Sequence, residues 1–301
     1  MKHKQLLISI AGLMTIGLLA ACSAAAQSQP APASKTQAEP AAISEPSQVN
    51  PMPEATIKLT DDGFTAPAEM PAGIVAVNIN NSSTQSQEGG VVLGRLNEGV
   101  SYDDITALLA SDAPDGSKFD QMVTSLGGGD RSTIYNLTPG QYMAYFTGNI
   151  EGAPPISGLI TVKDEGNTAV APTADITVEM QEFAFIMPDE IKAGKHLWQI
   201  SNKGKQVHHM LIFQLPQGVT TNDIITWVSA DEPSGPPPFL NPDGPTIGGG
   251  FESISPGQRA WVEIDLPPGE YTVFCLLPDF TVMPPMSHIA HGMHRTLKVV
   301  E

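Results

Sequence analysis

The stretch CLLPDFTVMPPMSHIAHGMH, from Cys275 to His294, concentrates side chains that can bind a transition metal. Its twenty residues include one cysteine, three histidines and three methionines. A thiolate is a soft ligand that tolerates Cu(I), neutral imidazoles suit Cu(I) and Cu(II), and a distant thioether gives a weak axial contact that tunes a redox potential. The stretch is therefore either an ordinary loop or a metal site.

The chain that must position these residues contains two copies of one unit from about Met52 to its end. Four segments match in the same order, beginning at Thr60 and Glu179, at Glu88 and His208, at Ser125 and Thr246, and at Thr138 and Pro267. A shared order of this kind indicates a tandem duplication.

Each copy alternates short apolar segments, such as AVNIN, RAWVEIDL and EYTVFCL, with turns rich in proline and glycine. Alternation with a period of two predicts strands, and a Gly-Val pair followed by a capping residue predicts one short helix after the middle strand of each copy. We therefore predict an all-β protein of two tandem Greek-key β-sandwich domains, each with a short helical insert, over residues 53–165 and 174–301. The triple glycine that begins at Gly248, which has a counterpart in the first copy, is interpreted as a turn.

The duplication supplies an internal control for the metal site. Apart from His3, every histidine lies in the second copy: His196, His208, His209, His288, His291 and His294. Where the second copy has His208 the first has Gln87 or Gly89, and where it has Cys275 the first has Phe146. We expect the first copy to be a sandwich without metal ligands.

The order of ligands in the second copy, His and then Cys, His and Met around the final turn, resembles the cupredoxins, the type-1 blue-copper family. The strand end GEYTVFC and the spacing from His288 to Met293, with Gly292 before the methionine, carry the resemblance. The resemblance implies one type-1 copper ion and electron transfer, with these ligands: His208, Cys275 and His288, and Met293 in the axial position. It also implies an apolar shell of Phe274, Leu276 and Leu277 around the site.

The loop between the cysteine and the second histidine is longer than in plastocyanin and azurin, since twelve residues separate Cys275 from His288. Loop length alone costs little free energy, so a proline-stiffened excursion can still return His288 to the cysteine. Four residues of the loop are alternative metal ligands: His291 or His294 in place of His288, and Met283 or Met286 in place of Met293.

Several of these residues also have a purely structural interpretation. His209 follows His208 on a strand and faces the opposite side, so at most one of the two is expected to bind a single buried ion. His196 is expected to be structural. Cys275 by itself could be a buried core residue, because free cysteine behaves as a small apolar group.

The first residues are typical of export. Lys2 and Lys4 precede an apolar run that ends in LAAC, which resembles a bacterial lipobox. This resemblance implies a signal peptide over residues 1–21, lipidation of Cys22 and a protein anchored to the cell membrane, on the cell surface or in the periplasm. Residues 22–52, rich in Ala, Pro, Ser and Gln, are predicted to form a disordered tether.

The formal charge of -17 includes Lys2 and Lys4, so it becomes -19 without the signal peptide (-17 minus 2). Nucleic acid is therefore not an expected partner, whereas a basic redox protein such as a cytochrome would be attracted. The same charge is also explained by solubility alone.

Three functions are consistent with these patterns: an electron carrier with one type-1 copper, a copper-handling lipoprotein that uses the Met/His-rich loop, and a metal-free binding module. We do not expect an enzyme. The six histidines of the second copy are too few for the further copper centres of a multicopper oxidase, and the chain lacks G-x-S-x-G and H-E-x-x-H motifs.

Overall fold

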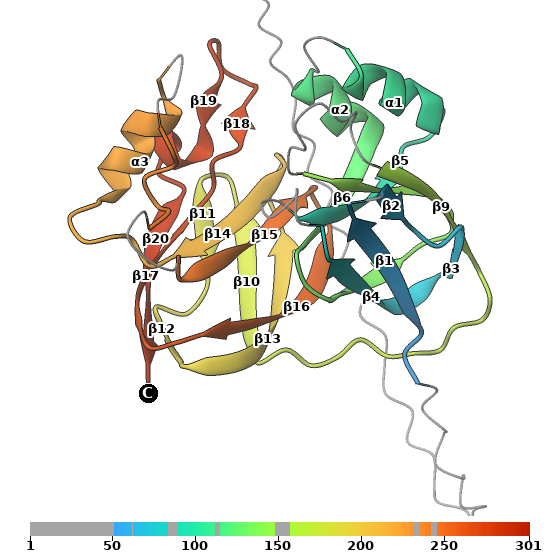
Figure 1. The fold of residues 1–301 in the computed structure, drawn as a ribbon, viewed down its shortest axis with the longest axis horizontal. Coiled ribbons are helices and arrows are strands. Elements are labelled where there is room, and N and C mark those ends of the chain that lie inside the picture. Colours follow the sequence, from blue (N-terminus) through green and yellow to red (C-terminus); the bar gives the residue numbers. More distant parts are fainter. Residues whose placement is uncertain are drawn as a thin grey trace, which may run out of the picture. The chain divides into compact units, whose positions relative to one another are not determined.

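Figure 1 shows the computed structural model of the chain, which describes residues 51–61, 63–83, 90–111, 115–147, 157–230, 235–241 and 246–301. These residues belong to one compact unit. The predicted signal peptide, Cys22 and all but the last two residues of the predicted tether lie outside the described residues. None of the described helices has the length and apolar character needed to cross a bilayer.

The first repeat is made mainly of short strands. Its elements are β1 (Glu54–Thr60), β2 (Gly63–Thr65), β3 (Glu69–Pro71), β4 (Gly73–Asn81), β5 (Val91–Leu96), α1 (Tyr102–Leu109), α2 (Gly116–Met122), β6 (Val123–Gly129), β7 (Thr133–Leu137), β8 (Gly140–Phe146) and β9 (Ser157–Lys163).

The second repeat has the same elements in the same order. They are β10 (Ile176–Gln181), β11 (Ala184–Ile186), β12 (Glu190–Lys192), β13 (Gly194–Asn202), β14 (His208–Phe213), α3 (Thr221–Val228), β15 (Gly248–Ile254), β16 (Arg259–Leu266), β17 (Gly269–Phe274) and β20 (His294–Val300). Among the elements in the described residues, only α2 in the first repeat, and β18 (Pro278–Asp279), β19 (Met286–Ser287) and the 3-10 helix η1 (His288–His291) in the second, lack a counterpart. The predicted all-β class, the duplication and the helical insert in each copy are confirmed.

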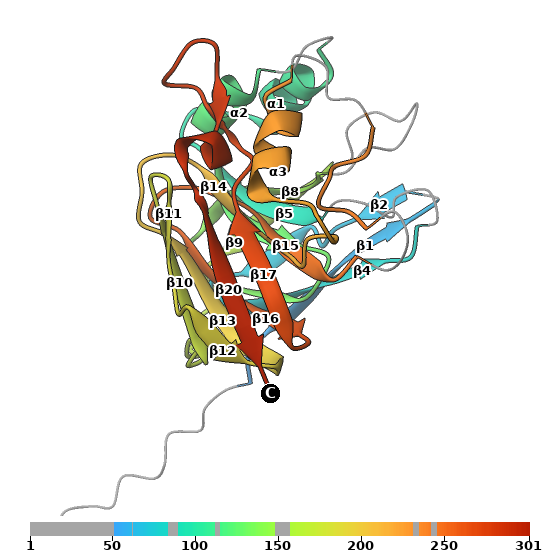
Figure 2. The same cartoon turned by 90° about the vertical axis from the view of Figure 1, so that its left-hand side faces the viewer.

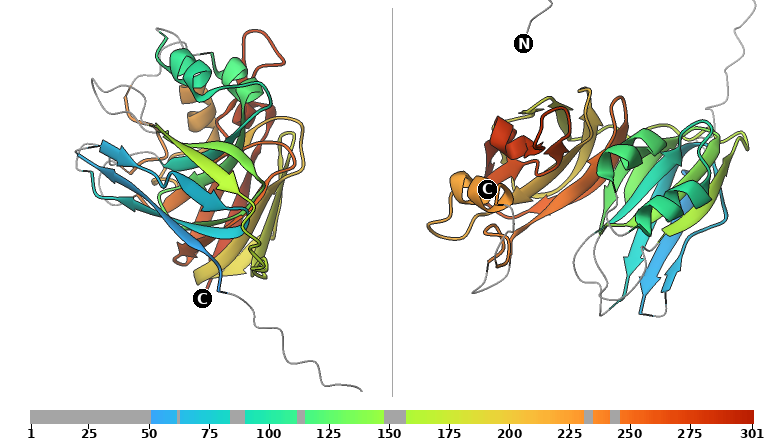
Figure 3. Two further views of the ribbon diagram at one scale, coloured as in Figure 1. Left: turned by 90° about the vertical axis from the view of Figure 1, so that its right-hand side faces the viewer. Right: turned by 90° about the horizontal axis from the view of Figure 1, so that it is seen from above.

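The two helical inserts begin in the same way. Asp104 Oδ2 accepts the backbone N–H of Ser101 at 2.9 Å, and Asp223 Oδ2 accepts that of Thr220 at 2.8 Å. A side chain that binds an unpaired N–H at a helix start stabilises that start. Seen from above (Figure 3, right), the green helices α1 and α2 lie over the strands of the first repeat and the orange helix α3 lies beside those of the second.

The strands form two large sheets, and each sheet continues from one repeat into the other. One has eight strands in the order β11-β10-β13-β16-β7-β4-β1-β2, and the other has ten in the order β12-β20-β17-β14-β15-β6-β5-β8-β9-β3. The repeats meet where β16 pairs with β7, with Val262 opposite Thr133, and where β15 pairs with β6, with Ile254 opposite Leu126. The domain boundaries at 165 and 174 stay a prediction.

The triple glycines do not form turns, so that prediction is wrong. Gly128 lies in β6 and Gly248 in β15. A Cβ at Gly128 would lie 2.1 Å from the carbonyl oxygen of Val91, and one at Gly248 would lie 2.1 Å from that of Ile212. The glycines are needed because the neighbouring strand backbone approaches so closely, which is a recognised use of glycine inside a strand.

The core consists of one large cluster and a smaller one under the helical insert of each repeat. The large cluster runs through both repeats and includes Tyr135, Trp198 and Phe251. In the second repeat, Ile224 of α3 packs with Phe274 and Ile289. In Figure 2, β17 and β20 run side by side with α3 near the ends where Phe274 and His294 lie. The insert therefore holds the segments on both sides of the Met/His-rich loop.

Candidate metal centre

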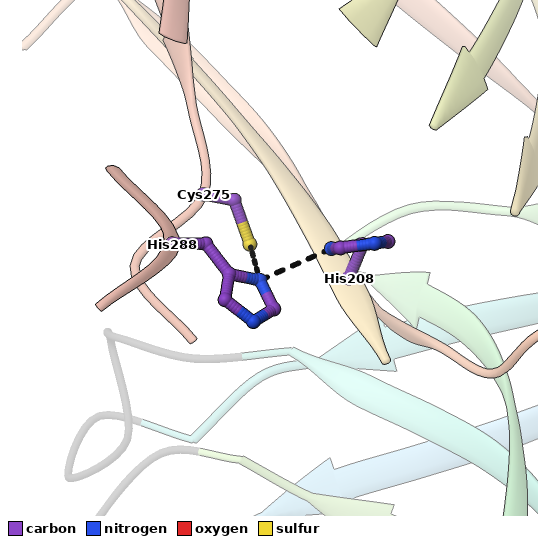
Figure 4. Close-up of side chains that lie close together, drawn as sticks. All are labelled: His208, Cys275 and His288. Atoms are coloured by element: carbon purple, nitrogen blue, oxygen red, sulfur yellow. Dashed lines mark hydrogen bonds between the residues drawn. The ribbon is translucent and has the colours of Figure 1, made fainter. Parts of the chain in front are cut away.

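Three predicted ligands converge at one end of the second sandwich (Figure 4). His208 begins β14, Cys275 directly follows β17 and His288 begins η1. Their donor atoms lie within 4.8 Å of one another, and all three side chains are fully buried. The Nδ1 atom of His288 lies 3.1 Å from Nδ1 of His208 and 3.4 Å from Sγ of Cys275. In Figure 4 all three donor atoms point toward one spot.

Pairing of β14 with β17 explains how His208 and Cys275 come together. Leu211 lies opposite Phe274, so the start of β14 and the end of β17 reach the same edge of the sandwich. The backbone N–H of His209 donates to the sulfur of Cys275 at 3.5 Å, which ties the two strand ends directly.

The long excursion after Cys275 is a small hairpin that returns to its starting point. Pro278 of β18 pairs with Ser287 of β19, and the backbone N–H of His288 donates to the carbonyl of Leu277 at 2.8 Å. The Ser287 hydroxyl donates to the carbonyl of Leu276 at 2.9 Å. His288 is therefore brought back beside Cys275 by hydrogen bonds across the base of the hairpin.

Met293 is joined to the site through its backbone. Its side chain is fully buried, its backbone N–H donates to the carbonyl of His288 at 3.0 Å, and its carbonyl accepts the N–H of Cys275 at 3.2 Å. The left-handed conformation of Gly292, with φ of +97°, ends η1 and allows this return. The backbone of Met293 thus bonds to both of these predicted ligands.

His209 has a role that its spacing did not predict. Its Nε2 accepts the backbone N–H of Leu276 at 2.7 Å, so this nitrogen carries no proton and the ring is neutral. Burial, followed by the charges of His288 and His208, lowers the pKa of His209 to about 3. His209 is not part of the cluster of donor atoms, and it holds the segment after the cysteine.

A second pair closes the outer part of the loop. His291 Nε2 lies 3.3 Å from Asp279 Oδ2, and the ring of Phe183 stacks on His291 with a centroid distance of 4.3 Å. Burial alone would raise the pKa of Asp279. Hydrogen bonds from Thr281 and the charge of His291 lower it more, so the pKa of this carboxyl lies below its ordinary value. Phe183 also meets His288 edge to face at 5.5 Å and adds to the apolar surroundings of the site.

Burial determines the protonation of the three donors. It is the main cause that lowers the pKa of His208 and of His288 to about 4, and it raises the pKa of Cys275 to about 12. The imidazoles are therefore neutral at neutral pH and present lone pairs, whereas the sulfur keeps its proton until a cation replaces it.

The donor set fits type-1 copper. Two imidazole nitrogens and one thiol sulfur converge in a dry environment beside a buried methionine, which is the combination that suits copper changing between Cu(I) and Cu(II). Phe274 of the predicted apolar shell is fully buried, and Leu276 and Leu277 are half-buried.

The four alternative ligands do not join the cluster. His291 pairs with Asp279, and His294 is exposed on β20. Met283 and Met286 are exposed, the former at 85% of its surface. His196, predicted to be structural, has its Nε2 3.0 Å from the carbonyl of Lys192.

The first repeat differs at the corresponding positions. Phe146 ends β8 opposite Val91, at the position that Cys275 occupies in the second repeat, and it belongs to the large core cluster. Gln87 and Gly89, the two candidates for the position of His208, lie outside the described residues.

No protein-family model matches this chain, and no curated protein matches it significantly. Among solved structures, it is similar to the dithionite-reduced auracyanin of the photosynthetic bacterium Roseiflexus castenholzii, at 22% identity and a TM-score of 0.27, covering 42% of this chain and 95% of that one. Auracyanin A, a "blue" copper protein of Chloroflexus aurantiacus, is 22% identical with a TM-score of 0.27, covering 41% of this chain and 97% of its own. The blue copper oxidase of Nitrosomonas europaea is 15% identical with a TM-score of 0.23, covering 82% of this chain and 86% of its own.

The chemistry of this chain depends on its own donor atoms. The second repeat is a β-sandwich in which His208, Cys275 and His288 meet beside the buried Met293 at one end, the arrangement that a resemblance to the cupredoxins implies.

Proposed function

We propose that the protein is a one-electron carrier with one type-1 copper in its second repeat. The observation that supports this most is the convergence of His208, Cys275 and His288 from three separate elements into one buried cluster. Copper bound there would supply a centre that gains and loses one electron.

The chain's own residues keep that centre fixed and dry. Strand pairing fixes His208 and Cys275, and the base of the hairpin fixes His288. A ligand set held in this way changes little between two oxidation states, which favours electron transfer over chemistry on a substrate. We therefore propose a carrier and not an enzyme.

The test is copper stoichiometry with a visible spectrum, measured on the soluble fragment that begins near Met52. We expect one copper per chain and a strong visible absorption from the Cu(II)-thiolate bond, and we expect Cys275→Ala to abolish that absorption. A colourless copper-loaded oxidised protein, or a spectrum unchanged by Cys275→Ala, would contradict the proposal. If the protein binds no copper after reconstitution, the remaining function of the three is a metal-free binding module.

Copper handling is the second candidate, and the exposure of Met283 in the loop and of Met286 in β19 favours it. Copper affinity would then survive Cys275→Ala but fall when Met283, Met286, His291 and His294 are replaced together. The electron carrier predicts the opposite pattern, because these four residues lie outside the cluster.

We also propose that the protein is lipid-anchored through Cys22 and acts outside the cytoplasm. The lipobox-like LAAC and the tether-like composition of residues 22–52 support this. We expect Cys22→Ala to move the protein from the membrane fraction to the soluble fraction. A membrane fraction unchanged by the substitution would exclude the anchor.

The acidic charge of the chain supports a basic redox protein such as a cytochrome as the partner. Its rate of electron exchange with such a protein should fall steeply as salt is added, because screening weakens attraction between exposed charges. A rate independent of salt would exclude electrostatic attraction to a basic partner.

A further inference from the structure

Gln206 contacts His288 on the side of the ring that faces away from Cys275. Its Oε1 lies 3.2 Å from Nε2 of His288, and it belongs to the segment between β13 and β14. Neither its residue type nor its position suggested a role in the site.

The contact decides which nitrogen of His288 carries the proton. A neutral imidazole has one N–H and one lone pair. An amide oxygen only accepts, so Gln206 Oε1 binds the Nε2–H form of the ring and leaves a lone pair on Nδ1. That Nδ1 is the atom that faces Sγ of Cys275 and Nδ1 of His208.

Gln206 is itself held from two sides. Its backbone N–H donates to Oε1 of Glu182 at 3.0 Å, and its carbonyl accepts from Nδ2 of the fully buried Asn202 at 2.7 Å. Glu182 also accepts the backbone N–H of Lys205. Burial raises the pKa of Glu182, but these backbone donors lower it more, so the pKa stays below its ordinary value and the carboxylate remains an acceptor.

Gly204, in the turn that presents Gln206, lies close to Glu182 and His208. A Cβ at Gly204 would lie 2.5 Å from Oε1 of Glu182 and 3.1 Å from Nε2 of His208. The N–H of Gly204 donates to Oδ1 of Asn202 at 2.8 Å. The turn therefore lies close to both Glu182 and His208, and hydrogen bonds to Asn202 and Glu182 hold the backbone that carries Gln206.

We propose that Gln206 is a positioning residue that holds His288 in the Nε2–H form and thereby sets the copper affinity and redox potential of the centre. This inference rests on the proposed copper site. Partners in the second shell of a metal site orient the ligands and raise their basicity, and their loss typically costs about 10- to 100-fold in metal affinity.

The chain offers a matched control in Gln258. Gln206 and Gln258 both line a cleft of about 540 Å³ whose other walls include Asp120 and Gln121 of α2. Gln258 bonds through its backbone to Ser255 and Asn202, and its side chain makes no hydrogen bond to the residues that the structure describes. The same substitution at either glutamine therefore alters the lining of the same cleft, but only the one at Gln206 changes the contact with His288.

The first measurement uses the copper-free protein, so that it does not depend on metal. Imidazole nitrogen shifts from NMR should show His288 as the Nε2–H form in the wild type, in Gln206→Glu and in both Gln258 variants, and as a mixture of forms in Gln206→Leu. The Nδ1–H form in the wild type, or an unchanged ring in Gln206→Leu, would overturn the inference even if copper binds.

The second measurement uses the copper-loaded variants. Gln206→Leu should weaken Cu(II) binding by about 10- to 100-fold and raise the redox potential, because a weaker donor stabilises Cu(II) less. A tenfold change in the ratio of Cu(II) to Cu(I) affinity corresponds to 59 mV for one electron. Gln206→Glu keeps the acceptor and adds negative charge, so it should lower the potential.

The control variants separate a specific contact from a general charge effect. Gln258→Leu should leave the Cu(II) affinity within about twofold of the wild type, which is well below the second-shell range, and should shift the potential by far less than 59 mV. If Gln258→Glu shifts the potential as much as Gln206→Glu, the contact with His288 is not the cause. If the wild type binds no copper at all, the proposed function fails while the NMR result still decides the role of Gln206.

Discussion

At the scale of single residues, burial is the main cause that lowers the pKa of His208, His288 and His209. Each imidazole is neutral because it lies away from water, and His209 is neutral also because its Nε2 accepts a backbone N–H. Protonating any of them would place a charge in a dry environment and would break the bond from Leu276 in the case of His209.

The folded protein without metal should therefore lose stability in mild acid. The pKa of His209 is about 3 in the folded state and about 6.5 in the unfolded state, so the unfolded state binds more protons between these values. The free energy of unfolding should fall as the pH drops below about 6.5, by about 3 kcal/mol at pH 4 from this residue alone. Urea denaturation at a series of pH values from 7 to 4 measures this free energy of unfolding.

The control for this expectation is His209→Gln, which cannot titrate in this range. Its free energy of unfolding should depend less steeply on pH than that of the wild type. Equal slopes for the two proteins would mean that His209 does not carry the effect.

The sequence located the candidate donors but not their supports. The asymmetry of histidines between the repeats, and the order of His, Cys, His and Met, led to the residues that the structure brings together. Gln206, Glu182, Asp279 and the structural role of His209 were not predicted, because amides, acids and single histidines have no characteristic spacing and act only through contacts made in the fold.

At the scale of elements, α3 supports the site from outside. Ile224 is fully buried against Phe274, which precedes Cys275, and Ile289, which follows His288. The corresponding residue of α1, Ile105, is equally buried but packs in a separate cluster of the first repeat. The two helices therefore form a natural pair for comparison.

We expect Ile224→Ala and Ile105→Ala each to cost about 2–5 kcal/mol of stability, because both leave a cavity in a packed cluster. Only Ile224→Ala should broaden the electron paramagnetic resonance spectrum of the copper-loaded protein, since it loosens the segments that carry two ligands. Equal spectra for both variants would show that α3 does not support the site.

The loop and the glycine runs show the limit of prediction at this scale. The hairpin after Cys275 has strands of only two residues, too short for a periodic pattern, so the return of His288 could only be expected from the family resemblance. The triple glycines resemble turns in sequence, and only the neighbouring backbones explain why they lie inside strands.

At the scale of the whole molecule, a reciprocal pair of buried hydrogen bonds joins the repeats. The N–H of Ser125 donates to Oγ of Ser255 at 2.9 Å, and the N–H of Ser255 donates to the carbonyl of Ser125 at 2.8 Å. Duplication could be recognised from the sequence because it leaves matching segments. The joining of the sheets could not, because pairing between edge strands depends on backbone groups that every sequence has.

Ser255→Ala should lower the free energy of unfolding by about 1–3 kcal/mol, because it leaves the buried N–H of Ser125 without its acceptor. Ser253→Ala is the control, since its side chain makes no hydrogen bond within the described part of the chain. Urea denaturation followed by tryptophan fluorescence measures both variants. A loss as large for Ser253→Ala would show that the bond across the junction is not responsible.

The continuation of both sheets across the repeats has a consequence for self-association. Joining the two repeats edge to edge doubles the number of strands in each sheet, but each sheet still has only two edge strands. These four edge strands, β2, β3, β11 and β12, are only three residues long. Short outer strands offer little unpaired backbone for another chain to extend. Molecules at high concentration should therefore resist joining into fibrils through their sheet edges.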